Sequence, residues 1–346
     1  MKIKKQKFGL LSDGKKAYLY TISNGNISFS VTNYGCIITS IIVPGKDGVK
    51  ADIALGSSTF EGVVSSSSYF GAMVGRFANR IGGSKFLLHN NVYNLCANDN
   101  GNCLHGGFPF WDKVLWDAEI VKTSAGSGVC FTRVSPDGEQ GMPGNLKVSV
   151  TYILSHLNEI IIKYTAVSDK DTPVNFTNHS YFNLAGQTGT IENHVLTMNC
   201  PSYLEVDKNL IPTGKIIPVD NTIFDFREGK SIGKDLLDKE IEGTGGYDHC
   251  YCISHNMEGF TQFATVFEPE SGRKMSVSTD LPGVQFYSGN SLNGTKGKNG
   301  MTYKKYSGFC LETQYYPDSP NKPEFPSCIL KAGEKFKSTT IYKFEW

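Results

Sequence analysis

The sequence contains no apolar run that approaches the ~20 residues of a membrane-spanning helix. Its opening residues, Met1 to Lys7, lack the apolar stretch of a secretory signal. The nine cysteines are odd in number and scattered along the chain, which does not suit a disulfide framework. We therefore expect a cytoplasmic protein whose thiols are reduced.

A surplus of charge of either sign is also missing. Lysine and arginine total 34, aspartate and glutamate total 33, and the formal net charge is +1. Binding to nucleic acid or to an anionic membrane needs a basic surplus, so we expect neither partner. The one basic cluster, formed by Lys2, Lys4, Lys5 and Lys7, is typical of a frayed, solvated terminus.

The signatures of common cofactors and nucleophiles are absent as well. No glycine fingerprint follows a predicted strand and opens a helix, and no phosphate-loop lysine or serine-hydrolase elbow is present. His249, Cys250 and Cys252 are potential metal ligands, but no second cluster supplies closing ligands at zinc spacing. We expect no metal and no cofactor.

What the sequence does contain is β-strand patterning. Apolar and polar residues alternate, as in half-buried strands, at 27–32, 146–152 and 274–278. An isoleucine-rich run at 159–167 predicts a more buried strand, and residues 342–346 predict a final one. This patterning is typical of an all-β sandwich or barrel.

Turn and helix signals complete the organisation. The 37 glycines and 14 prolines punctuate many short elements, and residues 268–273 predict a hairpin turn. Helical signals are few, and the clearest predicts a short helix over 231–242. No linker or internal repeat divides the chain, so we expect a single domain over residues 1–346.

Two polar segments supply the minimum for proton transfer. His179 lies among small, polar and aromatic residues in 177–186, in a chain with only seven histidines. Glu312 lies between apolar and amide neighbours in 308–318. One of these groups can give a proton near neutral pH and the other can take one. The sequence therefore predicts an acid–base site if the two segments meet in the fold.

Other segments mix polar groups with aromatics and glycines: 75–81, 102–107, 246–249 and 283–288. Arg80 offers a rigid fork of donors that suits a cleft, although a solvated strand end would also explain it. His105 precedes two glycines, which let a backbone approach a ligand or simply form a turn. Such a mixture suits a sugar, whose hydroxyls need polar partners and whose C–H faces pack on rings.

Taken together and in this order, the segments resemble the aldose 1-epimerase family. The resemblance rests on 75–81, 104–107, 111–116, 177–186, 247–249, 283–290, 311–314, 317–321 and 325–327. It implies a large antiparallel β-sandwich, probable only as an expectation at this stage, that interconverts the α and β anomers of a hexose such as galactose or glucose. It also implies a monomer that needs no metal and no cofactor.

The resemblance assigns roles residue by residue. Glu312 resembles the family's catalytic base and His179 its catalytic acid. The positions that resemble the family's contacts to sugar hydroxyls are Asn79, Arg80, His105, Tyr181, Asp248 and Gln285. Two departures are visible: Cys250 stands where asparagine is expected, and Ala332 stands where proline is usual. Neither touches the expected acid or base.

Three rival functions remain open on the sequence. A glycosidase would need two carboxylates flanking the bond, and Asp248 with Glu312 could form such a pair. A sugar-binding module would have the same cleft without catalysis. A hexose-6-phosphate 1-epimerase would need an added basic pocket, for which only Arg76 and Arg80 are at hand. For the anomer reaction we expect a bell-shaped pH profile, with its acidic limb from Glu312 and its basic limb from His179.

Overall fold

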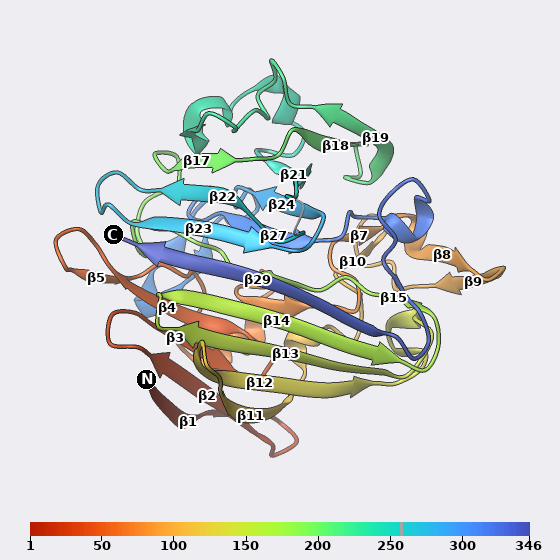
Figure 1. Cartoon of the computed structure of the whole chain (residues 1–346), viewed down its shortest axis with the longest axis horizontal. Helices are drawn as coiled ribbons and strands as arrows, with labels where there is room; N and C mark the ends of the chain where they lie inside the picture. The colour runs from red at the N-terminus through yellow and green to blue at the C-terminus, as the bar shows by residue number, and fades with distance from the viewer. Residues whose placement is uncertain (257–258) are drawn as a thin grey trace.

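The computed structural model describes residues 1–256 and 259–346, and antiparallel strands dominate it (Figure 1). Its largest sheet has nine strands, and the C-terminal strand β29 lies in its middle, between β14 and β23. In spatial order the strands are β11 (Asp117–Lys122), β12 (Gly126–Ser135), β13 (Leu146–Ser155), β14 (Glu159–Ser168), β29 (Lys335–Glu345), β23 (Lys274–Thr279), β22 (Thr261–Phe267), β17 (Val195–Met198) and β20 (Lys230–Ser231).

Two further sheets have five strands each. The N-terminal sheet runs in chain order: β1 (Lys2–Leu10), β2 (Lys16–Ser23), β3 (Ser28–Thr32), β4 (Ile38–Pro44) and β5 (Lys50–Asp52). The other sheet has the order β19 (Pro212–Pro218), β18 (Ser202–Val206), β21 (Asp248–Cys252), β24 (Gly283–Tyr287) and β27 (Cys310–Gln314). This second sheet carries most of the candidate site.

Short ribbons and single turns connect the sheets. The two-stranded ribbons are β6 (Ala72–Val74) with β16 (Thr177–His179), β7 (Arg80–Ile81) with β10 (Cys103–Leu104), β8 (Lys85–Leu88) with β9 (Asn91–Asn94), β15 (Thr172–Pro173) with β28 (Ile329–Leu330), and β25 (Thr295–Lys296) with β26 (Thr302–Tyr303). The described part of the chain has one α-helix, α1 (Phe60–Ser65), which Thr59 caps by accepting from the backbone N–H of Gly62. The 3₁₀ turns are Gly82–Ser84, Trp111–Lys113, Glu139–Gly141, Ile232–Asp235, Lys239–Ile241, Lys298–Gly300 and Ser319–Asn321.

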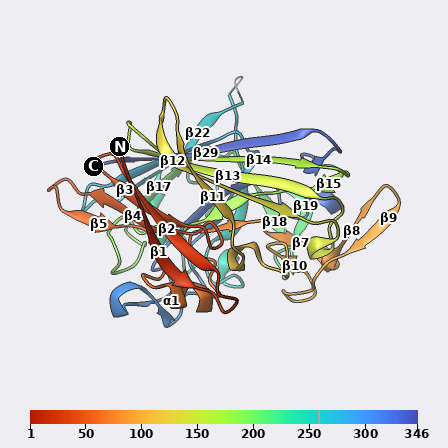
Figure 2. The ribbon, with the colours of Figure 1, turned by 90° about the horizontal axis from the view of Figure 1, so that it is seen from below.

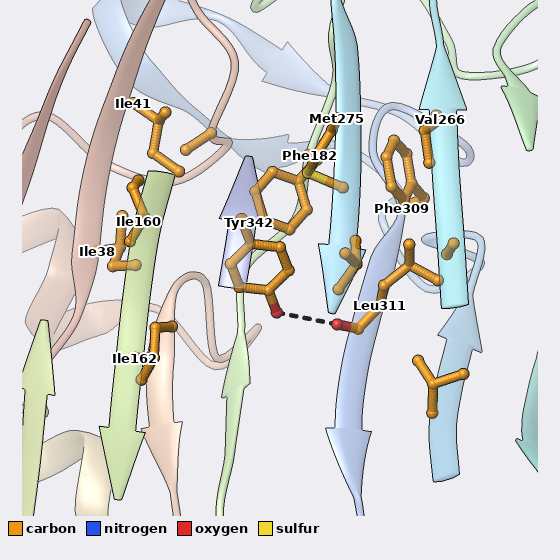
Figure 3. Close-up of a cluster of buried hydrophobic side chains, with 14 of the residues drawn as sticks. Ile38, Ile41, Ile160, Ile162, Phe182, Val266, Met275, Phe309, Leu311 and Tyr342 are labelled. Atoms are coloured by element: carbon orange, nitrogen blue, oxygen red, sulfur yellow. Dashed lines mark hydrogen bonds between the residues drawn. The ribbon is translucent and has the colours of Figure 1, made fainter. Parts of the chain in front are cut away.

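The main core lies between the layers. Figure 2 shows β13, β14 and β29 in one layer, with β1 to β4 and β18 in the other. In the close-up of Figure 3, Ile160 and Ile162 of β14 lie beside Ile38 and Ile41 of β4. All four side chains are buried, because alternate residues of each strand point inward. This packing confirms the predicted all-β sandwich with few short helices.

The strand predictions agree with the structure apart from their ends. The patterns at 27–32, 146–152, 159–167 and 274–278 correspond to β3, β13, β14 and β23. The predicted final strand is β29, which begins earlier, at Lys335, and ends at Glu345. Residues 268–273 connect β22 to β23 as predicted. None of the helices among the described residues is long and apolar enough to cross a membrane.

Two local predictions were wrong. The lysine cluster at the N-terminus is not frayed, because β1 pairs with β2 along its length and Lys5 lies over the ring of Tyr18. Residues 231–242 do not form one helix; they form two 3₁₀ turns, Ile232–Asp235 and Lys239–Ile241. Asp238 separates the turns in an extended conformation and caps the second by accepting from the backbone N–H of Glu240.

Candidate active site

Three neighbouring strands direct alternate side chains into one cavity of about 550 Å³. On β27, Leu311 joins the core while Glu312 lines the cavity. On β24, Phe286 joins the core while Gln285 lines the cavity, and Asp248 begins β21 beside them. The alternation of a strand thus anchors these carboxylate and amide groups on a packed sheet. The cavity has the size of a small-molecule site.

The cavity brings together all eight residues that the sequence singled out as acid, base and sugar contacts. Each one lines its wall. The further arginine of the 75–81 segment does not belong to the site. Arg76 is fully buried elsewhere and donates to Ser135 and to the carbonyl oxygens of Pro136 and Pro143.

The two expected proton-transfer groups face each other. His179 ends β16, and its Nε2 lies 3.6 Å from Oε1 of Glu312. Its Nδ1 lies 3.6 Å from the sulfur of Cys310, which shares a face of β27 with Glu312. The second carboxylate oxygen of Glu312, Oε2, is buried and has no hydrogen-bond partner in the described structure. A buried oxygen of this kind is costly to leave unpaired, and a ligand hydroxyl would satisfy it.

Burial acts on both groups in the direction that removes charge. Burial raises the pKa of Glu312 well above its ordinary value, the charge of Asp248 raises it further, and Arg80 opposes the rise. Burial lowers the pKa of His179 to about 4. At neutral pH the pair therefore carries one proton, and in the free protein that proton resides on the carboxyl group.

Two tyrosines hold the ring of His179 between their faces. The ring of Tyr181 lies 5.0 Å from it at an interplanar angle of 22°, and the ring of Tyr69 lies 5.9 Å from it at 23°. Tyr69 also contacts His105, with ring centroids 4.7 Å apart. The backbone of Tyr69 is left-handed, with φ of 55°, an uncommon conformation for a bulky residue.

The ribbon of β7 and β10 supplies donors from the opposite wall. Nδ1 of His105 accepts from the backbone N–H of Asn79 at 3.2 Å, so the proton of the neutral ring resides on Nε2. Burial, together with the charges of His179 and Arg80, holds the pKa of His105 well below its ordinary value. His105 is therefore a neutral donor. Arg80 is fixed by Asp99, which accepts from its Nε at 2.7 Å.

Glycine permits the close approach that this ribbon needs. Gly106, directly after His105, has φ of +83°, and a Cβ there would lie 2.5 Å from the carbonyl oxygen of Gly75. The backbones of Asn79 and His105 are themselves left-handed, with φ of 66° and 54°. The two donors are thus held by strained, tightly packed turns.

A chain of amides orients Asp248. Its Oδ1 accepts from Nε2 of Gln285 at 2.6 Å, and Oε1 of Gln285 accepts from Nε2 of Gln314 at 3.4 Å. Burial raises the pKa of Asp248, while Arg80 and the bond from Gln285 oppose the rise. The carboxylate is therefore fixed as an acceptor that can select a hydroxyl by its position.

Metal-ligand geometry in the described residues occurs in one place. His179, Cys310 and Glu312 each offer one ligand atom, and these atoms lie within 4.8 Å of one another. The segment that the sequence offered as a weak metal candidate, with His249, Cys250 and Cys252, does not form such a group within the described chain. Burial and the charges of Glu312 and Asp248 raise the pKa of Cys310 well above its ordinary value, so its thiol stays protonated at neutral pH.

Sequence reasoning missed several residues of the wall. Tyr69, Thr244, Tyr287 and Asn290 line the cavity beside the predicted set. Tyr287 could have been found, since it follows Gln285 at the two-residue spacing of one strand face. Tyr69 gave no such signal, because it lies in a loop between α1 and β6 and its contact with His179 is purely tertiary.

Comparisons with known proteins agree with this site. The family model described as aldose 1-epimerase matches residues 18–343. A galactose mutarotase from Mus musculus is 46% identical over 341 residues, covering 97% of both chains. An aldose 1-epimerase from Escherichia coli (strain K12) is 37% identical over 339 residues, again covering 97% of both. The crystal structure of a galactose 1-epimerase from Lactobacillus acidophilus NCFM superposes with a TM-score of 0.88 at 30% identity, covering 99% of this chain and 98% of that one.

Proposed function

Because this chain belongs to the aldose 1-epimerase family, we propose that it interconverts the α and β anomers of aldohexoses such as galactose and glucose, with Glu312 and His179 as its proton-transfer pair. One observation carries this assignment. Oε1 of Glu312 and Nε2 of His179 lie 3.6 Å apart in the wall of a cavity of about 550 Å³. No other part of the proposal is needed to place an acid and a base beside one sugar ring.

Opening the ring requires two proton transfers. The anomeric hydroxyl loses its proton while the ring oxygen O5 gains one, the C1–O5 bond breaks, and an open-chain aldehyde forms. Rotation about C1–C2 presents the other carbonyl face, and reclosure gives the other anomer. In the proposed mechanism the carboxylate of Glu312 takes the hydroxyl proton and the imidazolium of His179 protonates O5.

The proton count of the pair is the same at every stage. Before ring opening the one proton is on His179; after it, the proton is on Glu312, which is also where burial places it in the free protein. Binding of the closed sugar favours the first arrangement, because a hydroxyl can donate to the unpartnered Oε2 of Glu312 and stabilise its charge. Reclosure runs the same transfers backwards.

This count changes the expected origin of the pH limbs. The sequence analysis assigned the acidic limb to Glu312 and the basic limb to His179. Burial reverses that assignment, because it lowers the pKa of His179 to about 4 and raises that of Glu312 well above its ordinary value. Activity is lost below pH 4 when His179 gains a second proton for the pair, and at alkaline pH when Glu312 loses the only one.

The remaining wall binds and orients the sugar. We propose that Arg80 and the Nε2–H of His105 donate to sugar oxygens, and that Asp248 accepts from a hydroxyl. Asn79, Gln285 and Tyr181 complete the set of contacts. Donors fixed before the substrate arrives stabilise charge as it develops on the sugar oxygens.

A phosphorylated substrate fits this cavity less well than a neutral hexose. Among the described residues that line it, Arg80 is the only arginine or lysine, and Asp99 already pairs with it at 2.7 Å. Arg76, the other arginine that the sequence offered for a phosphate, is buried away from the cavity. A phosphate dianion would lack the cluster of cations that usually binds it.

Polarimetry on freshly dissolved α-D-galactose and α-D-glucose tests the function. We expect relaxation to the anomeric equilibrium to be faster in proportion to protein concentration, with hexose 6-phosphates relaxing at the rate of buffer alone. A rate independent of the protein would contradict the assignment. Release of the aryl group from aryl-glycosides would indicate the glycosidase instead.

The wider organisation is part of the proposal. We propose a single domain, since one buried cluster includes residues from Tyr20 to Phe344. A cytoplasmic monomer is consistent with the free thiols of all nine cysteines, each of which lies in the described part of the chain.

A further inference from the structure

A second cavity of about 680 Å³ adjoins the candidate active site. The two cavities share two wall residues, Arg80 and Thr244. They lie on opposite faces of strand β21, because Asp248 lines the first and its neighbour His249 lines the second. Only the rim that carries Arg80 and Thr244 therefore separates the two.

Aromatic rings form one wall of this second cavity. The ring of Tyr203 stacks on that of Phe224, with centroids 4.1 Å apart and an interplanar angle of 25°. Phe224 is 3% exposed and belongs to the main core, whereas Tyr203 is partly exposed. A rigid, partly exposed ring backed by the core is the kind of surface on which the C–H face of a sugar packs.

His249 gives this cavity a buried neutral donor. It is 5% exposed, and its Nδ1 accepts from the backbone N–H of Asp248 at 3.2 Å. The proton of the ring therefore resides on Nε2. The arrangement repeats that of His105 in the first cavity, where Nδ1 also accepts from a backbone amide and the ring lines the wall.

The opposite wall is the hairpin between β18 and β19. Asp207 accepts through Oδ1 from the backbone N–H groups of Asn209 and Ile211, so its carboxylate is held in place. Four carboxylates and two cationic side chains line the cavity as a whole. That balance repels a phosphate or another anion but offers acceptors to neutral hydroxyl groups.

We propose that the second cavity is a subsite for a second sugar ring, so that the substrates include reducing disaccharides. The reducing ring would occupy the cavity of Glu312 and His179, and the next ring would cross the rim at Arg80 and pack on Tyr203. This inference rests on the proposed function for turnover, but not for binding. Mutarotation of the reducing ring does not alter the glycosidic bond, so the second ring contributes binding alone.

The test compares D-glucose with two disaccharides of glucose, maltose and isomaltose, whose second rings are attached at O4 and O6. Anomer exchange is measured by NMR for the wild type and for Asn209→Tyr, which introduces a ring into the wall of the second cavity. Ile216→Tyr is the matched control, because it adds the same ring to the same hairpin at an exposed position, 47% accessible.

We expect the wild type to convert at least one disaccharide with kcat/KM within tenfold of glucose. Asn209→Tyr should lower that value by about tenfold or more and leave glucose within twofold, while Ile216→Tyr changes neither. Tyr203→Ala should lower disaccharide turnover by roughly threefold to tenfold, the range of an aromatic contact. The subsite is refuted if both disaccharides are converted at less than a hundredth of the glucose value, or if Asn209→Tyr leaves the ratio unchanged.

A binding measurement separates failure of the subsite from failure of the function. Methyl β-maltoside, methyl β-isomaltoside and methyl β-glucoside cannot open, so calorimetry reports their affinity whether or not the protein is catalytic. We expect one disaccharide glycoside to bind more tightly than the glucoside, and Asn209→Tyr to abolish the difference. Loss of glucose turnover with this difference retained would overturn the proposed function alone, and equal affinities would overturn the subsite alone.

Discussion

Replacing Glu312 with glutamine should destroy activity while making the protein more stable at alkaline pH. Glutamine keeps the shape of the side chain but cannot take a proton. A positioned proton-transfer group contributes about 10²–10⁴-fold to a rate. We therefore expect kcat/KM for galactose to fall by at least about 100-fold, a loss of roughly 2.7 kcal/mol of transition-state stabilisation.

The stability change follows from burial. Glu312 is 3% exposed, its Oε2 has no partner in the described structure, and burial raises its pKa well above the ordinary value. A carboxyl group whose folded pKa is raised contributes stability that is fully present below its unfolded pKa and is lost as pH rises through the folded pKa. Glutamine has no such loss. The melting temperature of Glu312→Gln should therefore exceed that of the wild type by an amount that grows from pH 5 to pH 9.

Polarimetry and thermal melts at pH 5, 7 and 9 measure both effects on one set of samples. Glu268→Gln is the control, because Glu268 is equally buried but accepts from the backbone N–H groups of Glu270 and Ser271 at the β22–β23 turn. We expect that variant to melt lower and to keep its activity. If Glu312→Gln retains activity within threefold of the wild type, or melts lower at pH 9, the carboxylate is a structural group and the assignment fails.

Three further outcomes follow from the same geometry. His179→Asn should lower kcat by about 100-fold or more in the polarimetric assay, and a change confined to KM would show that His179 only binds sugar. The profile of kcat/KM against pH should fall as pH drops through about 4 and fall again at alkaline pH; in Glu312→Asp the residual activity should keep the acidic limb, and an acidic limb that moves with this substitution would contradict its assignment to His179. Tyr69→Leu should lower kcat more than it raises KM, because it removes one face of the stack that positions His179, while Tyr69→Phe keeps that face and should stay within threefold of the wild type.

The sequence predicted the site better than it predicted the fold's details. Glu312 and Gln285 could be placed because strand alternation is local: their neighbours Leu311 and Phe286 are apolar, so the polar residues must face the other way. The meeting of His179 with Glu312 could not be derived from local pattern, since β16 and β27 are distant in the chain. It came from the resemblance of motifs in order.

The failures have tertiary causes. The lysines of β1 look solvated, and their side chains largely are, but the backbone of β1 pairs with β2, a contact that composition does not reveal. Arg76 and Arg80 belong to one short motif, yet one is buried among carbonyl oxygens and the other lines the cavity. The second cavity was also hidden, because Tyr203 and His249 come from separate strands of a sheet whose order follows no sequence signal.

The central place of β29 ties the chemistry to the completion of folding. This strand joins the β11–β14 half of the nine-stranded sheet to the half that begins at β23, and the hydroxyl of Tyr342 donates to the carbonyl oxygen of Leu311, next to Glu312 (Figure 3). Its partners on β14 pair residues as far apart as Glu159 and Lys343, a loop that is slow to close. Catalytic competence should therefore emerge last during refolding, after most of the β structure has formed, which makes turnover itself a reporter of the fully assembled sheet.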